Sequence, residues 1–275
     1  MRKLIFLLTV FVVSIAPYAQ AVVYLDLDAN EVDQNYTTSH DFMEMYRASN
    51  PNGAAIMIYP GGAYAWKSMD YEGRLFADFY NELGITVFVV SYALPYGNSN
   101  VPLNCVERAM RGIKAHAEEY SVNPDKIGVM GSSAGGHLAS THATHFSIDT
   151  RPAFQVLLYP VITMDASLTH AESRANIIGT NPSEDDIALF SNELRVREDS
   201  PMAYIIVSQD DIVVPVENSL RYYKSLLDNN VPAELHVVPT GGHGWGSGET
   251  FTYHEYFINT LRTWLQEKVL PVIGE

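Results

Sequence analysis

The sequence predicts an α/β fold with a mostly parallel central sheet and helices on both faces. Short apolar, β-branched runs alternate with helical stretches from about residue 54 onward. Most of these runs are continuously apolar rather than alternating in polarity, which is typical of strands covered on both faces. Alternation of such strands with helices predicts parallel neighbours joined by helical crossovers.

Six apolar runs are the candidate strands. In chain order they are 54–59, 85–92, 126–130, 154–159, 202–207 and 234–238. Between them, apolar residues recur at helical spacing, so that each stretch has one apolar face. These faces comprise Leu75, Phe76, Phe79, Tyr80 and Leu83; Val106, Ala109, Met110, Ile113 and Ala117; Leu220, Tyr223, Leu226 and Leu227; and Tyr256, Phe257, Leu261, Trp264 and Leu265.

Two further segments flank or interrupt this alternation. Residues 22–50 are polar and irregular, and they are predicted to form an edge hairpin or an arm. Residues 162–200 are long for a connection, and they contain Ser183 followed by three acidic residues, which signals the start of a helix. In an open α/β sheet this excursion would lie above the carboxyl ends of the strands, where ligands bind.

Length and composition exclude several classes of protein. The chain has 275 residues, of which 47% are hydrophobic and 18% charged, so disorder and a helical membrane bundle are excluded. The net charge of −15 would repel phosphate backbones and anionic membranes, which argues against a nucleic-acid-binding protein. Cys105 is the only cysteine, so no internal disulfide is expected, and its distance from the N-terminus argues against a lipid anchor there.

The N-terminus has the pattern of a secretory signal peptide. Two cations precede an uncharged apolar run at 4–16, and Ala19-Gln20-Ala21 then gives the small–x–small cleavage pattern. The run is shorter than the roughly 20 residues that span a bilayer. The predicted organisation is therefore a signal peptide at 1–21 and a single domain at 22–275, exported to the periplasm or the medium.

A glycine-rich turn follows the strand predicted at 126–130. It reads Gly131-Ser132-Ser133-Ala134-Gly135, which is G-x-S-x-G between a strand and a helix. Such a turn holds its serine in a strained, exposed position and directs the helix N-terminus toward it. Ser133 is therefore the predicted nucleophile, and Ser132, in the variable position of the motif, is the local alternative.

A serine nucleophile needs a base, and that base needs a carboxylate to orient it. On this kind of sheet the expected chain order is serine, acid, histidine. Asp210 and Asp211 follow the strand at 202–207, and His243 lies in a glycine-rich loop after the last strand. His243 is the predicted base and Asp211 the predicted acid, because of its spacing to Val214-Pro215. Asp210 remains the alternative acid.

The loop after the first of these strands is the candidate for binding a negatively charged oxygen. It reads Pro60-Gly61-Gly62-Ala63-Tyr64, and the backbone amides of Gly62, Ala63 and Ala134 are predicted to form an oxyanion hole. Ala63 stands where a third glycine is common, which is acceptable if its φ is negative. An ordinary turn is the alternative interpretation of this loop.

Other side chains near these motifs have weaker assignments. Tyr64, Trp66 and Trp245 are candidates for stacking on a sugar ring or an aromatic acid, although each could equally be packing. A zinc site at His137, His142 and His145 is not predicted, because the first two point apart on a helix and no carboxylate completes a ligand set.

These motifs resemble the α/β-hydrolase esterases, specifically the bacterial carbohydrate esterases that include acetyl xylan esterases and their feruloyl-esterase relatives. The matching segments are 59–64, 131–137, Asp210-Asp211 with Val214-Pro215, Asn218-Ser219 and 241–246. The resemblance implies the α/β-hydrolase fold, a triad of Ser133, Asp211 and His243, no cofactor and an acetylated carbohydrate substrate. Ser208-Gln209 departs from the His-Gly of many relatives, so the loop carrying the acid is expected to differ from theirs in detail.

The predicted function is therefore that of a secreted serine esterase. It would remove acetyl or other short acyl groups from a plant polysaccharide or oligosaccharide, with xylan as the expected polymer. The alternatives are a feruloyl esterase, a dipeptidyl-peptidase-like serine hydrolase with the same triad, and a non-catalytic binding module, against which the complete triad argues.

Overall fold

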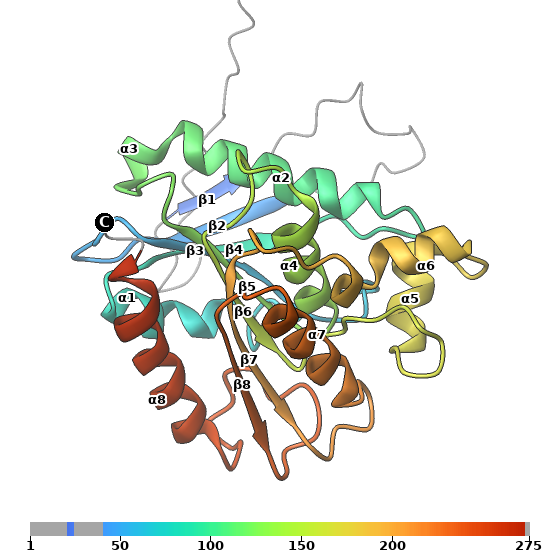
Figure 1. Cartoon of the computed structure of the whole chain (residues 1–275). Helices are drawn as coiled ribbons and strands as arrows, with labels where there is room; N and C mark the ends of the chain where they lie inside the picture. The colour runs from blue at the N-terminus through green and yellow to red at the C-terminus, as the bar shows by residue number, and fades with distance from the viewer. Residues whose placement is uncertain (1–20, 25–40, 273–275) are drawn as a thin grey trace, which may run out of the picture.

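The computed structural model describes residues 21–24 and 41–272, and these residues form one eight-stranded sheet with helices on both faces (Figure 1). The strand order is β1-β2-β4-β3-β5-β6-β7-β8, and the six strands from β4 to β8 along this order are parallel. The strands are β1 (Ala21–Tyr24), β2 (Phe42–Tyr46), β3 (Ala55–Tyr59), β4 (Thr86–Ser91), β5 (Ile127–Ser132), β6 (Phe154–Leu158), β7 (Met202–Ser208) and β8 (Ala233–Val238). The predicted fold class is confirmed.

The helices come between the parallel strands and after the last one. They are α1 (Ala77–Glu82), α2 (Asn100–Ala115), α3 (Ala117–Tyr120), α4 (Ala134–His145), α5 (Ala171–Ile178), α6 (Glu184–Phe190), α7 (Glu217–Asp228) and α8 (His254–Trp264), with short 3₁₀ turns at Arg74–Phe76 and Asn192–Leu194 and a π-turn at Leu265–Val269. The predicted apolar faces lie on these elements, although Ala117 belongs to α3 rather than α2 and Leu265 follows the end of α8. Four residues predicted on these faces are exposed: Leu75, Leu220, Leu227 and Tyr256. The stretch predicted at 75–83 is divided, because it opens with the first 3₁₀ turn before α1 begins.

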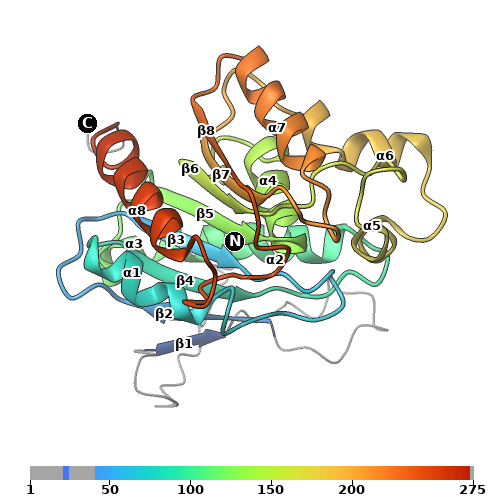
Figure 2. The same cartoon turned by 90° about the horizontal axis from the view of Figure 1, so that it is seen from below.

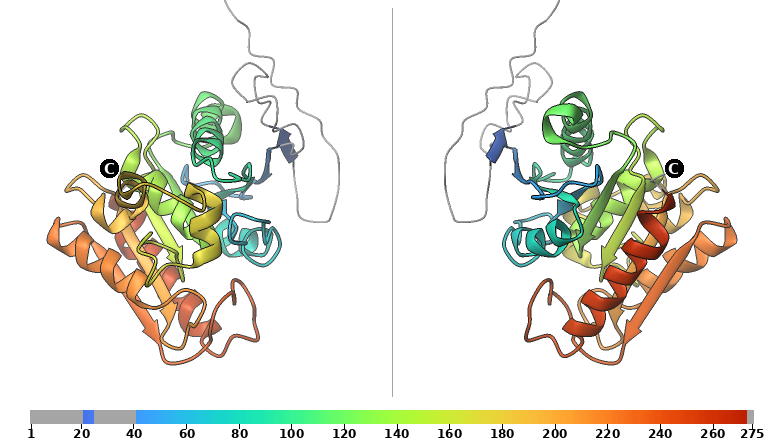
Figure 3. Two further views of the ribbon diagram at one scale, coloured as in Figure 1. Left: turned by 90° about the vertical axis from the view of Figure 1, so that its right-hand side faces the viewer. Right: turned by 90° about the vertical axis from the view of Figure 1, so that its left-hand side faces the viewer.

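The core consists of two layers, one on each face of the sheet. Alternate residues of a strand point to opposite faces. Met57 of β3 therefore belongs to the core layer that includes residues of α2, α4 and α7, while Ile56 and Ile58 belong to the layer that includes residues of α1 and α8. Figures 2 and 3 show α1 and α8 on one side of the sheet, with α4 and α7 on the other. Strands β3 to β7 are buried along nearly their whole length for this reason, which explains their unbroken apolar sequence.

The two segments outside the regular alternation are placed by specific pairings. In the part of 22–50 that the structure describes, β1 pairs antiparallel with β2, which in turn pairs with β4, so the predicted edge hairpin is present to that extent. In the excursion at 162–200, the Ser183 hydroxyl accepts from the Asp186 amide at 3.0 Å and caps α6, as the sequence predicts. Asn176 of α5 reaches the loop after β3, at the carboxyl edge of the sheet.

The predicted signal peptide lies outside the described residues except for Ala21, so the cleavage site and the division at residue 21 stay predictions. Among the helices of residues 41–272, none is long and apolar enough to cross a membrane.

The approach of α4 to the sheet depends on two glycines. A Cβ at Gly131 would lie 2.0 Å from the carbonyl oxygen of Gly135, and a Cβ at Gly135 would lie 1.9 Å from the carbonyl oxygen of Tyr59. Both distances are far below van der Waals contact, and both neighbours are backbone atoms that cannot rotate away. The turn between β5 and α4 therefore packs directly on the end of β3.

This contact predicts a large loss of stability for Gly135→Ala. The added methyl group would force α4 away from β3, and we expect the free energy of unfolding to fall by about 3 kcal/mol, measured by urea denaturation. Gly112→Ala on α2 is the matched control, because nothing lies within 4 Å of its added Cβ. The control should gain about 0.5–1 kcal/mol from better helix propensity. Equal stability of the two variants would contradict the proposed contact.

Candidate active site

Ser133 lies on the sharp turn between β5 and α4. Its backbone has φ 54° and ψ −120°, a region that costs a non-glycine residue about 1–3 kcal/mol. Three backbone hydrogen bonds hold it there. The Ser133 amide donates to the Leu158 carbonyl at 3.0 Å, and its own carbonyl accepts from the amides of Val161 and His137 at 3.0 and 3.1 Å. The strand, turn and helix predicted around Ser133 are all present, although β5 continues to Ser132, two residues beyond the predicted end.

The structure brings the three predicted triad residues together. His243 Nε2 lies 2.8 Å from Ser133 Oγ, and His243 Nδ1 lies 2.7 Å from Asp211 Oδ2. Because an ionised carboxylate can only accept, Nδ1–H donates to Asp211, and Nε2 of the neutral ring accepts from the serine hydroxyl. The other carboxylate oxygen, Asp211 Oδ1, accepts from the amides of Val213 and Val214, both at 2.9 Å. The imidazole is thereby held in the tautomer that a general base needs.

The two alternatives within the motifs have different positions. Asp210 is exposed, and its Oδ1 accepts from the amide of Gly242 at 2.8 Å, so it holds the loop before His243 rather than the imidazole itself. Ser132 is the last residue of β5 and is completely buried. The geometry therefore favours Asp211 as the acid and Ser133 as the nucleophile.

The loop after β3 touches the serine turn. A Cβ at Gly61 would lie 3.0 Å from Ser133 Cβ, so the two backbones are in close contact. Among the described residues, the amides of Gly62 and Ala63 donate to no protein acceptor. The amide of Ala134 is in the first turn of α4, where an N–H has no partner within the helix. These three amides are available to an oxyanion, and their role stays a prediction.

The condition of a negative φ, under which alanine would be acceptable at position 63, is not met. The φ of Ala63 is +56°, and that of Tyr64 is +59°, so two successive non-glycine residues are left-handed. The turn enforces this conformation, because the amides of Ala65 and Trp66 both donate to the carbonyl of Gly62 at 2.9 and 3.1 Å. From the other side, Asn176 Nδ2 donates to the Ala63 carbonyl at 2.8 Å. Contacts with α5 therefore help to hold a backbone that the sequence alone would disfavour.

The three aromatic candidates for sugar stacking differ in exposure. Tyr64 is 1% exposed and its hydroxyl donates to His137 Nδ1 at 2.8 Å, so its predicted sugar contact is wrong: the ring is part of the core. Trp245 is 8% exposed, and one of its faces is covered by Phe251, whose ring centroid lies 4.2 Å away. Stacking of a sugar on that face is excluded. Trp66 is 61% exposed, and its sugar contact stays a prediction.

The histidines weighed as zinc ligands are used in hydrogen bonds instead. His137 Nε2 donates to the Phe190 carbonyl, and His142 lies between the Tyr59 hydroxyl and the Thr150 carbonyl, each at 2.8 Å. Burial lowers the pKa of both imidazoles to about 4, so that both are neutral at pH 7. Among residues 21–24 and 41–272, no three His, Cys, Asp or Glu side chains are grouped to hold a metal.

A cavity of about 340 Å³ lies beside His243. Its walls are the loop between β8 and α8, at 241–252, and the ring of Tyr71. Tyr71 is 54% exposed, whereas its backbone is held by the amide of Ser247, which donates to the Tyr71 carbonyl at 2.9 Å. This aromatic ring is presented at the entrance by a fixed backbone, and the sequence motifs gave no sign of it.

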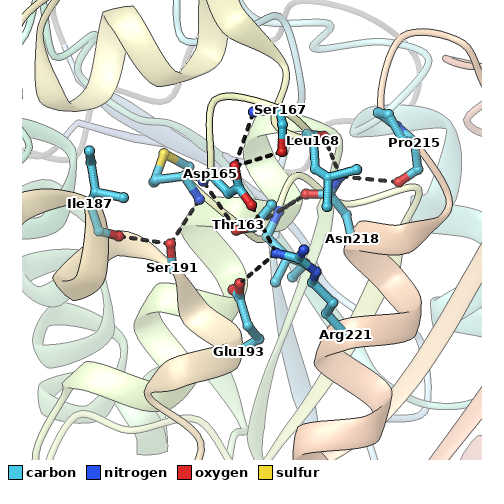
Figure 4. A network of polar contacts seen from close by, with 12 residues as sticks. Thr163, Asp165, Ser167, Leu168, Ile187, Ser191, Glu193, Pro215, Asn218 and Arg221 are labelled. Atoms are coloured by element: carbon cyan, nitrogen blue, oxygen red, sulfur yellow. Dashed lines mark hydrogen bonds and ion pairs between the residues drawn. The ribbon is translucent and has the colours of Figure 1, made fainter. Parts of the chain in front are cut away.

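A buried polar side chain on α7 also supports the site. Asn218 Oδ1 accepts from the amides of Ile162 and Thr163, while its Nδ2 donates to the carbonyls of Leu168 and Pro215, at 3.0–3.1 Å (Figure 4). It thus joins the segment after β6, whose Val161 amide donates to the Ser133 carbonyl, to the loop that carries Asp211. The Asn-Ser pair at 218–219 belongs to the resemblance described above, but its connections are visible only in the tertiary structure.

Two further side chains near the triad were not predicted from the sequence. Glu72 is 5% exposed and accepts hydrogen bonds from the Gly61 amide and the Tyr159 hydroxyl, and Tyr159 packs its ring against His243. Burial raises the pKa of Glu72 above its usual value. In the sequence, Glu72 lies in a polar connection and Tyr159 ends an apolar strand, so neither belongs to a motif.

Comparison with known proteins identifies the family to which the chain belongs. Residues 56–247 match the family model of the alpha/beta hydrolase fold. The chain belongs to this family. It is 37% identical over 233 residues to an acetylxylan esterase of Xylanibacter ruminicola, covering 83% of this chain and 48% of that protein. It is 34% identical over 234 residues to endo-1,4-beta-xylanase B of Butyrivibrio fibrisolvens, covering 78% of this chain and 36% of that protein.

A solved structure gives a similar result over nearly the whole domain. The acetyl ester-xyloside bifunctional hydrolase from Caldicellulosiruptor lactoaceticus aligns with a TM-score of 0.84 and 29% identity, covering 90% of this chain and 96% of that chain. The predicted resemblance to carbohydrate esterases is confirmed. The chain spans about half or less of the length of the two curated relatives described above.

The positions of the two neighbouring aspartates predict that only one of their amide variants loses activity. Asp211→Asn places an amide opposite the imidazole and favours the wrong tautomer, so we expect kcat for an aryl acetate to fall by about 10⁴-fold. Asp210→Asn should keep kcat close to the wild-type value, since an amide oxygen can still accept from Gly242. Steady-state kinetics of the two purified variants measure this difference. A reversed order would make Asp210 the acid.

Proposed function

We propose that this protein is a serine ester hydrolase that removes acetyl groups from xylan or its oligosaccharides. The observation that carries the proposal is the hydrogen-bonded chain from Ser133 Oγ through His243 to Asp211, with distances of 2.8 and 2.7 Å. It lies beside a glycine-rich loop that has free backbone amides. Similarity to an acetylxylan esterase and to an acetyl ester-xyloside hydrolase supports the ester class and the acetylated carbohydrate.

In the first half of the reaction, Ser133 attacks the carbonyl carbon of the acetyl ester. His243 Nε2 takes the hydroxyl proton as the new C–O bond forms, and Asp211 stabilises the imidazolium. The amides of Gly62, Ala63 and Ala134 donate to the oxyanion, and a single such donor is typically worth about 3 kcal/mol in the transition state. The C–O bond to the sugar then breaks as His243 gives its proton to the sugar oxygen.

In the second half, water replaces the sugar. His243 takes a proton from this water as its oxygen attacks the acetyl-serine, and the same amides bind the second oxyanion. Collapse of the intermediate releases acetate and returns the proton to Ser133 Oγ. Every proton thus passes through His243 Nε2.

The cavity beside His243 suits the alcohol half of the substrate. Because His243 protonates the leaving oxygen, the sugar that carries this oxygen must lie on the His243 side of Ser133. The exposed ring of Tyr71 and the backbone of the loop at 241–252 are the surfaces available there. An aromatic ring beside polar backbone groups is a common way to bind a sugar, whose C–H face packs on the ring.

Release assays test the proposed substrate. We expect acetate from acetylated xylo-oligosaccharides, with little ferulate from methyl ferulate and no amine from an aminoacyl-proline amide. Ser133→Ala is the control, and its kcat should be lower by roughly 10⁶-fold, near the limit seen when a serine nucleophile is removed. Preference for methyl ferulate would make the enzyme a feruloyl esterase, and turnover of the amide alone would favour a peptidase.

The position of Tyr71 predicts a substrate-specific effect. Tyr71→Ala removes about 1 kcal/mol of ring packing on the sugar, so kcat/KM for the acetylated oligosaccharide should fall about fivefold relative to kcat/KM for an aryl acetate. Trp66→Ala tests the other exposed ring in the same assay, and it lines no part of this cavity. An equal loss on both ester substrates would argue that Tyr71 shapes the catalytic loops instead of binding sugar.

A further inference from the structure

A second buried carboxylate joins the loops that carry the proposed reaction. Glu72 lies in the connection between the oxyanion loop and α1, and its side chain points into the interior, with 5% of the residue exposed. Within the part of the chain that the structure describes, no Lys or Arg forms an ion pair with it. An acidic side chain is rarely buried without a pairing group, so its hydrogen-bond partners have to account for its position.

These two partners link Glu72 to the oxyanion loop directly and to the histidine loop through Tyr159. Glu72 Oε2 accepts from the amide of Gly61 in the oxyanion loop at 2.9 Å. Glu72 Oε1 accepts from the hydroxyl of Tyr159 at 2.7 Å, and Tyr159 directly follows β6. The Tyr159 oxygen in turn accepts from the amide of Gly246, in the loop that carries His243, at 2.8 Å. One carboxylate and one phenol therefore connect the oxyanion loop to the histidine loop.

Tyr159 also contacts the base itself. Its ring lies edge-on to the imidazole of His243, with 4.8 Å between centroids, and edge-on to Trp245 at 4.7 Å. The backbone of Tyr159 has φ +36°, which is strained for a bulky residue, and its amide donates to the Ile206 carbonyl at 2.7 Å. A displacement of the Tyr159 side chain would therefore move the ring against which His243 packs.

The hydrogen bonds match the ionised form of Glu72. The Gly61 amide can only donate, and the Tyr159 hydroxyl donates its proton to Glu72 Oε1 while its oxygen accepts from Gly246. Burial raises the pKa of Glu72, whereas the hydrogen bonds from Tyr159 and Gly61 and the nearby His243 oppose this rise. An anion at this place would attract a positive charge that forms on the imidazole.

We propose that Glu72 is a positioning residue of the proposed esterase: through Gly61 and Tyr159 it holds the oxyanion loop and His243 in one geometry, and its charge stabilises the imidazolium formed during attack. This inference depends on the proposed serine esterase reaction, but it does not depend on which ester is the substrate. It assigns Glu72 no contact with substrate, and Asp211 remains the residue that binds the imidazole.

The first test is Glu72→Gln, a change of nearly equal size. A glutamine must turn its NH₂ toward either the Gly61 amide or the Tyr159 hydroxyl, so one hydrogen bond is lost along with the charge. We expect kcat for an aryl acetate to fall about 10–100-fold, with KM nearly unchanged. Tyr159→Phe, which removes the hydroxyl but retains the Glu72 carboxyl group, should lower kcat by a smaller factor in the same range.

The pH profile separates charge from geometry. Four titratable groups face His243: Asp211 from the loop after β7, Tyr159 after β6, Glu72 before α1 and His170 at the start of α5. With Glu72 neutralised, protonation of the imidazole loses one favourable interaction. The acid limb of kcat/KM against pH should therefore move to lower pH in Glu72→Gln, and it should move less in Tyr159→Phe, where the carboxyl group is retained.

The control is Asp70→Asn, which removes a negative charge from the same connection. Asp70 is exposed and pairs with Arg74 on the surface, so kcat and the pH profile should remain those of the wild type. If Asp70→Asn matches Glu72→Gln, the effect is general electrostatics and the proposal is wrong. Wild-type kcat and pH profile in a folded Glu72→Gln would also overturn it. Should Glu72→Gln fail to fold, an unchanged kcat in Tyr159→Phe has the same consequence.

Labelling with a fluorophosphonate separates this inference from the proposed function. The probe reports the reactivity of Ser133 without any carbohydrate. A wild type that is labelled, with slower labelling in Glu72→Gln, supports the inference even if acetylated xylan is not cleaved. A wild type that is not labelled at all overturns both proposals, whereas equal labelling rates in the two proteins overturn only the role of Glu72.

Discussion

The left-handed backbone at Ser133 is the constraint on which the site depends. It turns the chain from β5 into α4 so sharply that Gly135 packs against the carbonyl of Tyr59, at the end of β3. The same packing places Gly61, two residues after Tyr59, in contact with Ser133. The nucleophile and the loop expected to bind the oxyanion are therefore parts of one close-packed unit, and neither can move without the other. The strain is offset by backbone hydrogen bonds to the end of β6.

Burial of two carboxylates is the second feature that shapes the site. Asp211 is surrounded by two amides and an imidazole, and Glu72 by an amide and a phenol, so each oxygen has a donor. A buried carboxylate without such donors would be costly or would become protonated. The protein has a net charge of −15, and at these two acids of the site the donors that replace water are backbone amides, an imidazole and a phenol.

Asparagine side chains on two helices supply much of this support. Asn176 of α5 holds the carbonyl of Ala63, and Asn218 of α7 links the segment after β6 to the loop of Asp211. The excursion at 162–200, which carries α5 and α6, therefore also supports the oxyanion loop. It holds a left-handed turn in the oxyanion loop that alanine and tyrosine would otherwise disfavour.

The sequence by itself determined the architecture and the identity of the central groups. Continuous apolar runs indicate buried parallel strands because both of their faces must be covered, and G-x-S-x-G between a strand and a helix leaves few conformations for Ser133. Local patterns of this kind depend on neighbours within about ten residues. The boundaries of the parallel strands were therefore predicted closely. β5 is the exception, because its pairing with β6 extends it beyond the predicted end.

Only the tertiary structure decided between Asp210 and Asp211, placed Tyr64 in the core, gave Ala63 a positive φ and revealed Glu72. Each of these outcomes depends on atoms far away in the chain: Tyr64 meets His137, Ala63 meets Asn176, and Glu72 meets Tyr159. Burial and hydrogen-bond partners at such separations follow from how the layers pack. Residue type and periodicity specify which element forms, but the contacts between elements decide what each side chain does.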